Sequence, residues 1–359
     1  MSEIRSALVV GTGLIGTSVA LALRGHGVVV HLTDRDPHAV RRAANLGAGD
    51  PALPTAQVDL AVVAVAPSAT ADVVSGLLAG NVAATVVDTA GVKADILRDV
   101  RATVGDAGHF VGTHPMAGRE RSGAGAARAD LFDGRPWVVV PDRVDPVSLT
   151  RAEELVRRCG GVVVHLDAAT HDAAVALVSH VPQVAATLVA ARLAEGQESA
   201  LALTGQGLRD VTRVAASDAD LWVDVLTANA VPVGRILTEL RADIDHVIAA
   251  LAEVTHDPDW GRTALREVLL RGNSVRARLP GKHGGRPTAY ALVPVVLPDQ
   301  PGELARLFAA AGDAGVNIED VSIEHSPGQP VGLVELSVAP GAQHALAQAL
   351  IERGWQLHS

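Results

Sequence analysis

The stretch that decides the fold is ALVVGTGLIG, residues 7–16. Four apolar residues, typical of a buried strand, lead into glycines at positions 11, 13 and 16 and then into a helical pattern. Here Gly11 permits a tight turn, Gly13 lets the backbone approach a pyrophosphate, and Gly16 lets the helix pack against the strand. The pattern predicts a dinucleotide-binding βαβ unit whose helix N-terminus receives the phosphates.

An acidic residue follows at the end of the second predicted strand. Asp34 is placed to accept hydrogen bonds from the adenosine ribose, and its charge would repel a 2′-phosphate. NAD is therefore favoured over NADP, although the neighbouring Arg35 leaves NADP open. The alternative for the glycines is a tight turn that binds nothing. The expected cofactor-binding residues are Gly11, Thr12, Gly13, Leu14, Ile15, Gly16 and Asp34.

Around this motif, strand-like apolar runs alternate with helical patterns, which predicts parallel βαβ units. The strand-like runs are residues 7–10, 28–32, 60–65, 85–87, 110–113, 137–140 and 162–165. After residue 166 the strand signals stop. The helical patterns that follow are residues 168–194, 207–216, 219–229 and 233–252. Ser217 is placed to cap the helix that begins at residue 219, and Pro182 is expected to bend the first of these helices.

A further change of composition marks the C-terminal region. Residues 271–288 are rich in Gly, Arg and Pro, which is typical of a basic linker. The strand–helix–strand–strand–helix pattern beyond them predicts a small α+β domain. The expected architecture is an α/β Rossmann-type doubly wound sheet (residues 1–166), an all-α second domain (167–270), the linker (271–288) and the α+β domain (289–359).

Composition narrows the classes of function. The net charge of −10, spread over 359 residues, disfavours a nucleic-acid partner. The single cysteine, Cys159, excludes a disulfide within the chain and suits the cytoplasm. Residues 168–194 are strongly apolar but contain His171, Asp172 and His180, so we expect a buried helix at a dimer interface rather than a membrane span. The histidine spacing implies no metal.

The segment FVGTHPMAGRERSG, residues 110–123, carries the candidate chemistry. It begins at the end of a predicted parallel strand, where doubly wound sheets bind ligands. Pro115 restrains the backbone of His114 to extended geometry, and Glu120 and Arg121 follow in a polar loop. A lone histidine before proline is most often an ordinary loop residue, so the spacing alone leaves the role of His114 open.

Several segments together resemble the prephenate/arogenate dehydrogenase family. Residues 110–123 resemble its G-x-H-P-[MI]-x-G-x-E-x-S-G segment, and SHVP at 179–182 resembles its S-H-x-P. GLRDVTR at 207–213 and SDADLW at 217–222 resemble its G-[FL]-[KR]-D-x-T-R run and the tryptophan beyond it. With the glycine motif, the resemblance spans residues 7–252 in the family's order.

The resemblance implies NAD-dependent oxidative decarboxylation of prephenate to 4-hydroxyphenylpyruvate in tyrosine biosynthesis. It places the general base on His114, because a neutral imidazole can accept the proton of the ring hydroxyl. It places recognition of the ring carboxylate on Arg213, since a guanidinium suits a planar carboxylate. A surface ion pair is the alternative for Arg213, and a place in the core is the alternative for His180 and Trp222. The other expected substrate-binding residues are Arg209, His180, Glu120, Gln183 and Trp222.

Two positions depart from the family pattern. Gly91 stands where many members have a serine that orients the catalytic histidine, so Thr89, Thr113 or a water would take over that task. Gln183 stands where some prephenate-specific members have a second histidine, which leaves arogenate dehydrogenase open as the activity. A non-catalytic sensor of NAD and an amino acid is the alternative from a different class.

Near the C-terminus, LPDQPGEL (297–304) and AGVNIED (314–320) resemble the ACT domain, a small amino-acid-sensing fold. The resemblance implies feedback inhibition by tyrosine, and a dimerisation module is the alternative. The expected partners are a dicarboxylate substrate, a tyrosine effector and a second copy of the chain bound through the helical domain, without a membrane. The expected regulatory residues are Asp299, Gly302, Gly315, Asn317 and Ile318.

Overall fold

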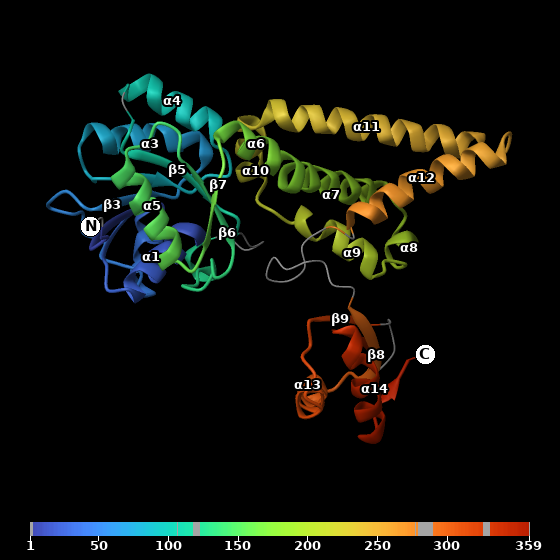
Figure 1. The fold of residues 1–359 in the computed structure, drawn as a ribbon. Helices are drawn as coiled ribbons and strands as arrows, with labels where there is room; N and C mark the ends of the chain where they lie inside the picture. Colours follow the sequence, from blue (N-terminus) through green and yellow to red (C-terminus); the bar gives the residue numbers. More distant parts are fainter. Residues whose placement is uncertain are drawn as a thin grey trace. The chain divides into compact units, whose positions relative to one another are not determined.

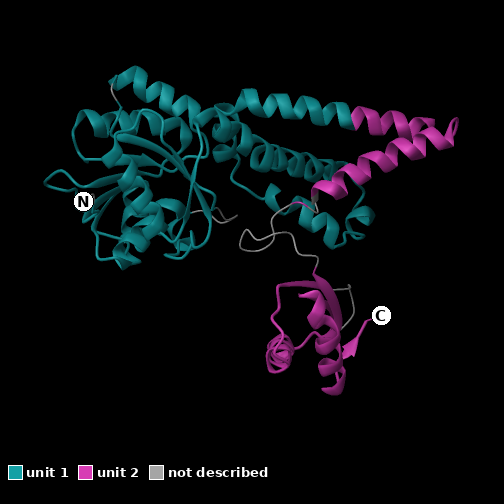
Figure 2. Cartoon of the chain, in the orientation of Figure 1, with its two compact units in different colours: residues 1–243 teal, residues 244–359 magenta. Residues whose placement is uncertain are grey.

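The computed structural model describes residues 3–105, 107–117, 123–276, 278, 290–325 and 331–358, and Figure 1 shows their helices and strands. The chain divides into two compact units, residues 1–243 and 244–359 (Figure 2). Helix α11 (Ala230–Glu253) begins in the first unit and ends in the second. The predicted dinucleotide motif and the predicted substrate-binding residues all belong to the first unit.

The first unit contains a seven-stranded sheet in the order β2-β1-β3-β4-β5-β6-β7. Its strands are β1 (Ser6–Val10), β2 (Val29–Thr33), β3 (Leu60–Val63), β4 (Val86–Asp88), β5 (Phe110–Pro115), β6 (Pro136–Val140) and β7 (Val162–His165). The pairings among the first five are parallel. Strand β6 runs antiparallel to β5 and parallel to β7. The predicted doubly wound sheet is present, with its last two strands reversed.

The reversal follows from the connection between β5 and β6. A parallel pair needs a crossover of a dozen or more residues, usually a helix. The described part of this connection has one short 3-10 turn, Ala124–Ala126, and no α-helix. The expectation of parallel units throughout the first half was therefore wrong for the direction of β6 and β7.

Helices cover both faces of the sheet (Figure 1). They are α1 (Leu14–Gly25), α2 (Pro37–Asn45), α3 (Pro67–Ala79), α4 (Ala94–Val104) and α5 (Pro146–Arg158). Alternate side chains of β3 enter different apolar clusters: Val62 packs with residues of α1, α2 and α5, and Val63 packs with residues of α3 and α4. Because the central strands are buried on both sides, their sequences are continuous apolar runs.

The rest of the first unit is helical, and Pro182 interrupts its first long helix. The elements are α6 (Ala168–Val175), a π-helical turn (Ala176–His180), α7 (Val181–Arg192), α8 (Glu198–Leu201), α9 (Gln206–Thr212) and α10 (Ala219–Ala228). Proline has no amide hydrogen to donate to the carbonyl of Val178, and the π-helical turn stands directly before it. The sequence predicted a bend at Pro182, and the structure shows a change of helix type there.

Helix α10 is capped by Asp218 rather than by the predicted Ser217. The Asp218 carboxylate accepts a hydrogen bond from the amide of Leu221 at 3.1 Å. The Ser217 hydroxyl donates instead to the carbonyl of Val214 at 2.6 Å. Serine and aspartate cap helices about equally well, so the sequence could not separate these two neighbours.

One helical run in the described residues, Ala168–Glu195, is long and apolar enough to cross a membrane by length and composition. His171, Asp172 and His180 lie within it, and all three are buried. Each of their side chains is hydrogen-bonded inside the first unit. Buried polar groups with fixed partners are typical of a protein core, so we interpret the buried side of this run as part of the core of the first unit.

The second unit holds the end of α11, then α12 (Pro258–Arg276) and a small α+β domain. The domain's sheet has the order β11-β8-β10-β9 with antiparallel pairings. A cluster that includes Leu307, Leu336 and Trp355 fills its core. Its elements are β8 (Ala291–Pro298), α13 (Glu303–Asp313), β9 (Asp320–His325), β10 (Val331–Val338), α14 (Gln343–Glu352) and β11 (Gln356–Leu357). This is the small α+β fold predicted for the C-terminal region.

Helix α12 corrects the predicted start of the linker. Residues 271–276, assigned to the linker from their composition, form the last turns of this helix. Gly272 lies inside it, because a single glycine in a helix costs only about 1 kcal/mol and does not have to end it. Of the remaining linker, residue 278 is described and the other residues lie outside the described ranges.

Candidate active site

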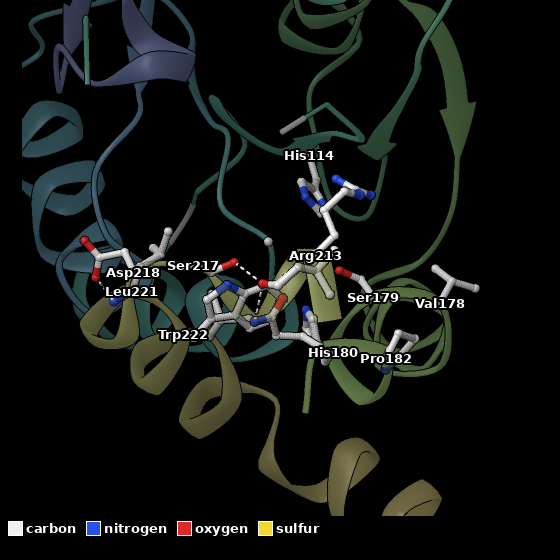
Figure 3. A pocket seen from close by; sticks show the side chains of 14 residues that line it. His114, Val178, Ser179, His180, Pro182, Arg213, Ser217, Asp218, Leu221 and Trp222 are labelled. Carbon is white, nitrogen blue, oxygen red and sulfur yellow. Dashed lines mark hydrogen bonds between the residues drawn. The ribbon is translucent and has the colours of Figure 1, made fainter. Parts of the chain in front are cut away.

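A pocket of about 570 Å³ lies between the sheet and the helical region of the first unit (Figure 3). From the sheet come Gly91, which follows β4, and His114, at the end of β5. The helical region contributes Val178, Ser179, His180, Pro182, Gln183, Arg213, Val214, Ser217, Asp218, Leu221, Trp222 and Val225. Because β1 is linked to β4 and β5 by parallel pairings, the glycine turn after β1 lies on the same sheet edge as Gly91 and His114.

The glycine turn has the geometry that a dinucleotide needs. Gly11 has a φ of +95°, and a Cβ there would lie 2.3 Å from the carbonyl oxygen of Ala64. A Cβ on Gly16 would lie 1.9 Å from the carbonyl oxygen of Gly11, so glycine is required at both positions. A Cβ on Gly13 would meet no described atom within 4 Å, and no side chain of the described residues caps α1 there. The backbone at Gly13 is therefore open to a pyrophosphate.

Asp34, just after β2, is tied to this turn. Its carboxylate accepts hydrogen bonds from the backbone amide of Thr12 at 2.6 Å and from the Thr12 hydroxyl at 3.0 Å. It also accepts one from the amide of Asp36 at 3.0 Å. A carboxylate has about four acceptor positions, so the group can hold the turn and still accept from a ribose hydroxyl.

His114 lies half-buried at the carboxyl end of β5, and its ring is fixed by a second imidazole. Its Nδ1 is 2.8 Å from Nε2 of His171, and the two rings meet edge to face. Burial is the main reason that the pKa of His114 lies well below its usual 6.5, and the nearby His171, Lys93 and His180 lower it further. The imidazole is therefore neutral at neutral pH.

His171 in turn contacts a carboxylate. Its Nδ1 lies 2.8 Å from Oδ1 of Asp172. The backbone amides of Lys93 and Ala94 donate to Oδ1 and Oδ2 of Asp172, each at 2.8 Å. These bonds, together with the contact to His171, lower the pKa of Asp172 despite its burial. An ionised carboxylate thus stands at the far end of a His114–His171–Asp172 chain.

A buried ion pair between Lys93 and Asp88 lies next to the strand that carries His114. Both side chains are inaccessible to solvent. Asp88 also accepts from the amide of Thr113 at 3.0 Å, and Trp137 donates its indole N–H to the Thr113 hydroxyl at 3.0 Å. The hydroxyl of Thr89 faces the carbonyl of Val63. Neither threonine proposed from the sequence therefore orients His114, and His171 does so instead.

His180 is held by Asn229. The Asn229 side-chain nitrogen donates to the backbone carbonyl of Asp172 at 2.8 Å and lies 3.0 Å from Nδ1 of His180. Because that nitrogen must be a donor, Nδ1 of His180 accepts and Nε2 carries the proton. Burial lowers the pKa of His180 to about 4. His180, whose ring packs edge to face on Trp222, is thus a neutral donor and not a cation.

Gln183 and Ser217 converge on one carbonyl of the pocket wall. The amide nitrogen of Gln183 donates to the carbonyl of Val214 at 2.9 Å, and the Ser217 hydroxyl donates to the same oxygen (Figure 3). A carbonyl oxygen only accepts hydrogen bonds, so the Gln183 atom that faces Val214 must be the amide nitrogen rather than the amide oxygen. The other atom, Oε1, is an acceptor.

The structure brings one of the two predicted arginines to the pocket. Arg213 lines it, and Figure 3 shows its side chain pointing toward His114. Arg209 is exposed and does not line the pocket. Helix α9 ends at Thr212, so Arg209 lies in the helix and Arg213 in the 3-10 turn that follows it. Glu120 lies outside the described residues.

The predicted regulatory residues lie at the two ends of α13 in the second unit. Gly302 and Gly315 flank the helix with φ of +92° and +68°, a conformation that favours glycine. The Asn317 amide donates to Glu319 at 2.7 Å. Asp299 and Ile318 stand in the turns next to these glycines. The five residues therefore belong to the two turns that enclose one helix.

The fold and the site together define a class of protein. A Rossmann-type sheet with an open glycine turn binds a dinucleotide, and the pocket on the same edge offers a neutral histidine and an arginine. In the described ranges, no group of three or more His, Cys, Asp or Glu side chains could hold a metal ion. The glycine turn, the neutral histidine and the arginine are the features of a nicotinamide-dependent dehydrogenase that oxidises a small carboxylate-bearing alcohol.

Known proteins point to one family within this class. The profile of the prephenate dehydrogenase nucleotide-binding domain matches residues 19–165, and that of the prephenate dehydrogenase dimerization domain matches residues 167–269. The Probable prephenate dehydrogenase NovF of Streptomyces niveus is 43% identical, over 99% of this chain and 100% of its own length. The cyclohexadienyl dehydrogenase of Zymomonas mobilis is 28% identical, over 80% of this chain and 100% of its own.

A solved structure has the same fold. The prephenate dehydrogenase from A. aeolicus, in complex with hydroxyphenyl propionate and NAD⁺, is 24% identical with a TM-score of 0.66. The match covers 76% of this chain and 99% of that one. The chain described here belongs to the prephenate dehydrogenase family. The predicted family is confirmed, and with it the prediction of an NAD-dependent dehydrogenase of prephenate or arogenate.

His171, Asp172 and Asn229 belong to the site but were not predicted as site residues. His171 and Asp172 were noticed only as polar residues in an apolar helix. An adjacent His-Asp pair in the first turns of such a helix is a usable signal, because burial of both requires fixed partners. Asn229 offers no comparable signal, because its partners are distant in the sequence.

Proposed function

We propose that this chain catalyses the NAD-dependent oxidative decarboxylation of prephenate to 4-hydroxyphenylpyruvate. The observation that supports it most directly is the shared pocket of His114 and Arg213, on the sheet edge that carries the glycine turn. A neutral imidazole and a guanidinium are the groups that a ring alcohol bearing a carboxylate requires.

The proposed roles follow from the chemistry of each side chain. The Nε2 atom of His114 takes the proton of the ring hydroxyl as the carbinol is oxidised. Arg213 holds the ring carboxylate through paired N–H···O bonds. His180 donates its Nε2 proton to a substrate oxygen, and Trp222 forms an apolar wall beside it. Loss of carbon dioxide then needs little assistance, because the ring becomes aromatic.

The glycine turn and Asp34 are the proposed NAD site. The turn at Gly11–Gly16 would hold the pyrophosphate and Asp34 the adenosine ribose. When bound there, NAD⁺ supplies the hydride acceptor for the reaction. Since Asp34 carries a negative charge against which a 2′-phosphate would lie, we expect NADP⁺ to be used poorly.

Arogenate is the second candidate substrate, and Gln183 favours it. With its amide nitrogen bound to Val214, Gln183 offers an oxygen acceptor. The side-chain ammonium of arogenate can donate to this oxygen, whereas the keto oxygen of prephenate cannot. We therefore propose Gln183 as the residue that discriminates between the two substrates.

One set of assays tests these proposals. Steady-state rates are measured with prephenate and with arogenate, each with NAD⁺ and NADP⁺, for the wild type and for His114→Asn. We expect His114→Asn to bind NAD⁺ normally and to lose about 100-fold or more in kcat. Full activity of this variant would remove His114 as the base. A kcat/KM that favours arogenate would make the second candidate the activity.

The helical region is the proposed dimer contact. Leu177, Leu188 and Val223 are 60%, 59% and 61% exposed in the first unit, and all three lie within the residues that match the dimerization-domain profile. We expect a homodimer in sedimentation experiments at micromolar concentration and a location in the cytoplasm. The substitution Leu177→Glu should shift the equilibrium toward the monomer.

The C-terminal α+β domain is the proposed regulatory module. Its candidate ligand is tyrosine, bound near the turns that contain Asp299, Gly302, Gly315, Asn317 and Ile318. Support comes from the predicted order of elements and from the left-handed glycines at both ends of α13. Tyrosine is titrated into the full chain and into a chain that ends before β8. Equal inhibition of both would assign the effect to the active site instead.

A further inference from the structure

A chain of three side chains leads away from the pocket behind His114. It runs from Nδ1 of His114 to Nε2 of His171 at 2.8 Å, and from Nδ1 of His171 to Oδ1 of Asp172 at 2.8 Å. His171 and Asp172 do not line the pocket and so do not touch the substrate. His171 contacts the proposed base on the side opposite to the reaction, and Asp172 in turn contacts His171.

The protonation of this chain can be read from its Asp172 end. The two backbone amides that donate to the Asp172 carboxylate hold it in the ionised, acceptor-only form. His171 must therefore donate its Nδ1 proton to Asp172, and a neutral ring then has a bare lone pair at Nε2. Both side chains are buried, so water does not compete for these positions.

The position of the proton on His114 follows from that on His171. Because Nε2 of His171 is an acceptor, Nδ1 of His114 must carry the proton that joins them. The neutral His114 ring then has its only lone pair on Nε2. That nitrogen is on the Gly91 side of the ring, where a Cβ at position 91 would lie 3.8 Å from it, and Gly91 and His114 both line the pocket.

We infer that His171 and Asp172 are positioning residues that hold His114 in the Nδ1–H tautomer, with its accepting lone pair directed into the pocket. The inference deepens the proposed function and rests on His114 being the base. In the reaction, the O–H bond of the substrate hydroxyl breaks and an Nε2–H bond forms. The resulting imidazolium keeps its Nδ1–H bond to His171, and the Asp172 carboxylate faces the new charge through that ring.

The arrangement also explains how His114 functions without a neighbouring hydroxyl at position 91. Gly91 provides no hydrogen-bonding side chain, and the Thr113 hydroxyl is used by Asp88 and Trp137. A neutral ring with no partner at Nδ1 would exchange between two tautomers, and one of them has no lone pair toward the substrate. The contact with His171 removes that second tautomer.

Two substitutions at position 171 separate this role from simple packing. His171→Leu fills the space but removes the acceptor for His114. His171→Gln keeps an acceptor oxygen for His114 and a donor for Asp172, so it preserves the tautomer. We expect kcat/KM to fall about 100-fold in His171→Leu and to stay within about tenfold of wild type in His171→Gln. His165→Leu, at an exposed histidine, is the matched control.

The pH profile provides a readout that packing would not change. The charged groups and imidazoles facing His114 are His171, Lys93, His180 and Arg213. The acid limb of kcat/KM should move to lower pH in His171→Leu, because protonated His114 loses its charge-assisted hydrogen bond to the neutral His171 ring. This loss outweighs the relief of the charge repulsion by which His171 lowers the pKa of His114. It should stay in place in His171→Gln and His165→Leu. A limb that is unchanged, or displaced to higher pH, in His171→Leu would overturn the inference.

A spectroscopic test needs no variant of the pair. In protein labelled with ¹⁵N-histidine, the His114 signals are identified by their loss in His114→Asn. At neutral pH we expect a protonated, pyrrole-like Nδ1 and a bare, pyridine-like Nε2 for His114. The opposite pattern refutes the inference even if His114→Asn is inactive. Full activity of His114→Asn, in contrast, refutes the proposed function and leaves the tautomer assignment standing.

Discussion

Gly91 and His114 are neighbours in the pocket: a Cβ at position 91 would lie 3.8 Å from both Nε2 and Cε1 of the imidazole. That is an ordinary van der Waals distance, and Gly91 has no left-handed backbone that would require glycine. A small side chain therefore fits at position 91, next to the nitrogen that is proposed to accept the proton.

The first prediction concerns Gly91→Ser. We expect a melting temperature close to wild type and a kcat/KM within about tenfold of it, because His171 already orients the base. A serine hydroxyl that donates to Nε2 stabilises the neutral ring, so the acid limb of the pH profile should move to lower pH. Gly91→Val is the contrasting variant, because its branched side chain would occupy the substrate's place. Equal rates for the two variants would show that the substrate does not occupy the space beside His114.

The second prediction is the pH dependence of the wild type. Only the neutral form of His114 accepts a proton, so kcat/KM rises with pH through the pKa of this group and is constant above it. Burial holds that pKa below 6.5, so the acid limb should lie below pH 6.5 and the plateau should include neutral pH. His180, with a pKa of about 4, is neutral on the plateau at neutral pH. A limb centred above pH 6.5 would contradict the burial of the base.

The third prediction concerns Arg213→Lys. Lysine keeps the positive charge but cannot form the paired bonds that a guanidinium makes with a carboxylate. Loss of one charge-assisted hydrogen bond should raise KM about 10–100-fold, with a smaller change in kcat. Arg209→Lys, at the exposed arginine of α9, is the control and should leave KM unchanged. If the two substitutions have the same effect, Arg213 is not the carboxylate ligand.

The fourth prediction concerns the buried ion pair. Replacing Lys93 with methionine leaves the Asp88 carboxylate buried without its cation, which should reduce the free energy of unfolding by about 3–5 kcal/mol. Urea unfolding followed by far-UV circular dichroism measures the change. Arg98→Met, at an exposed arginine paired with Asp95, should have no measurable effect. A similar change in the free energy of unfolding for both variants would mean that the buried Lys93–Asp88 pair contributes no more to stability than an exposed pair.

The glycine turn and the order of the elements could be predicted because their signals are local. A side chain at Gly11 would collide with Ala64, and one at Gly16 would collide with Gly11. Such close contacts arise wherever a strand, a tight turn and a helix pack in this way. Strand direction at β6 could not be predicted, because it depends on the path of a connection rather than on strand composition. The cap of α10 was misplaced by one residue, since Ser217 and Asp218 suit the position equally.

The candidate site was predictable in part. His114, His180, Gln183, Arg213 and Trp222 were expected from the resemblance and line one pocket. The partner of His114 was not predictable, because His171 lies 57 residues away and the contact exists only after the helical region packs on the sheet. Arg209 was also expected from the resemblance, but it is exposed and does not line the pocket.

Asp172 also ties two parts of the first unit together. Its carboxylate accepts from the amides of Lys93 and Ala94 at the start of α4, and its own carbonyl accepts from Asn229. This junction lies beside both pocket histidines, since His171 holds His114 and Asn229 contacts His180. The hydrogen bonds that orient the two imidazoles are therefore in place before a substrate binds.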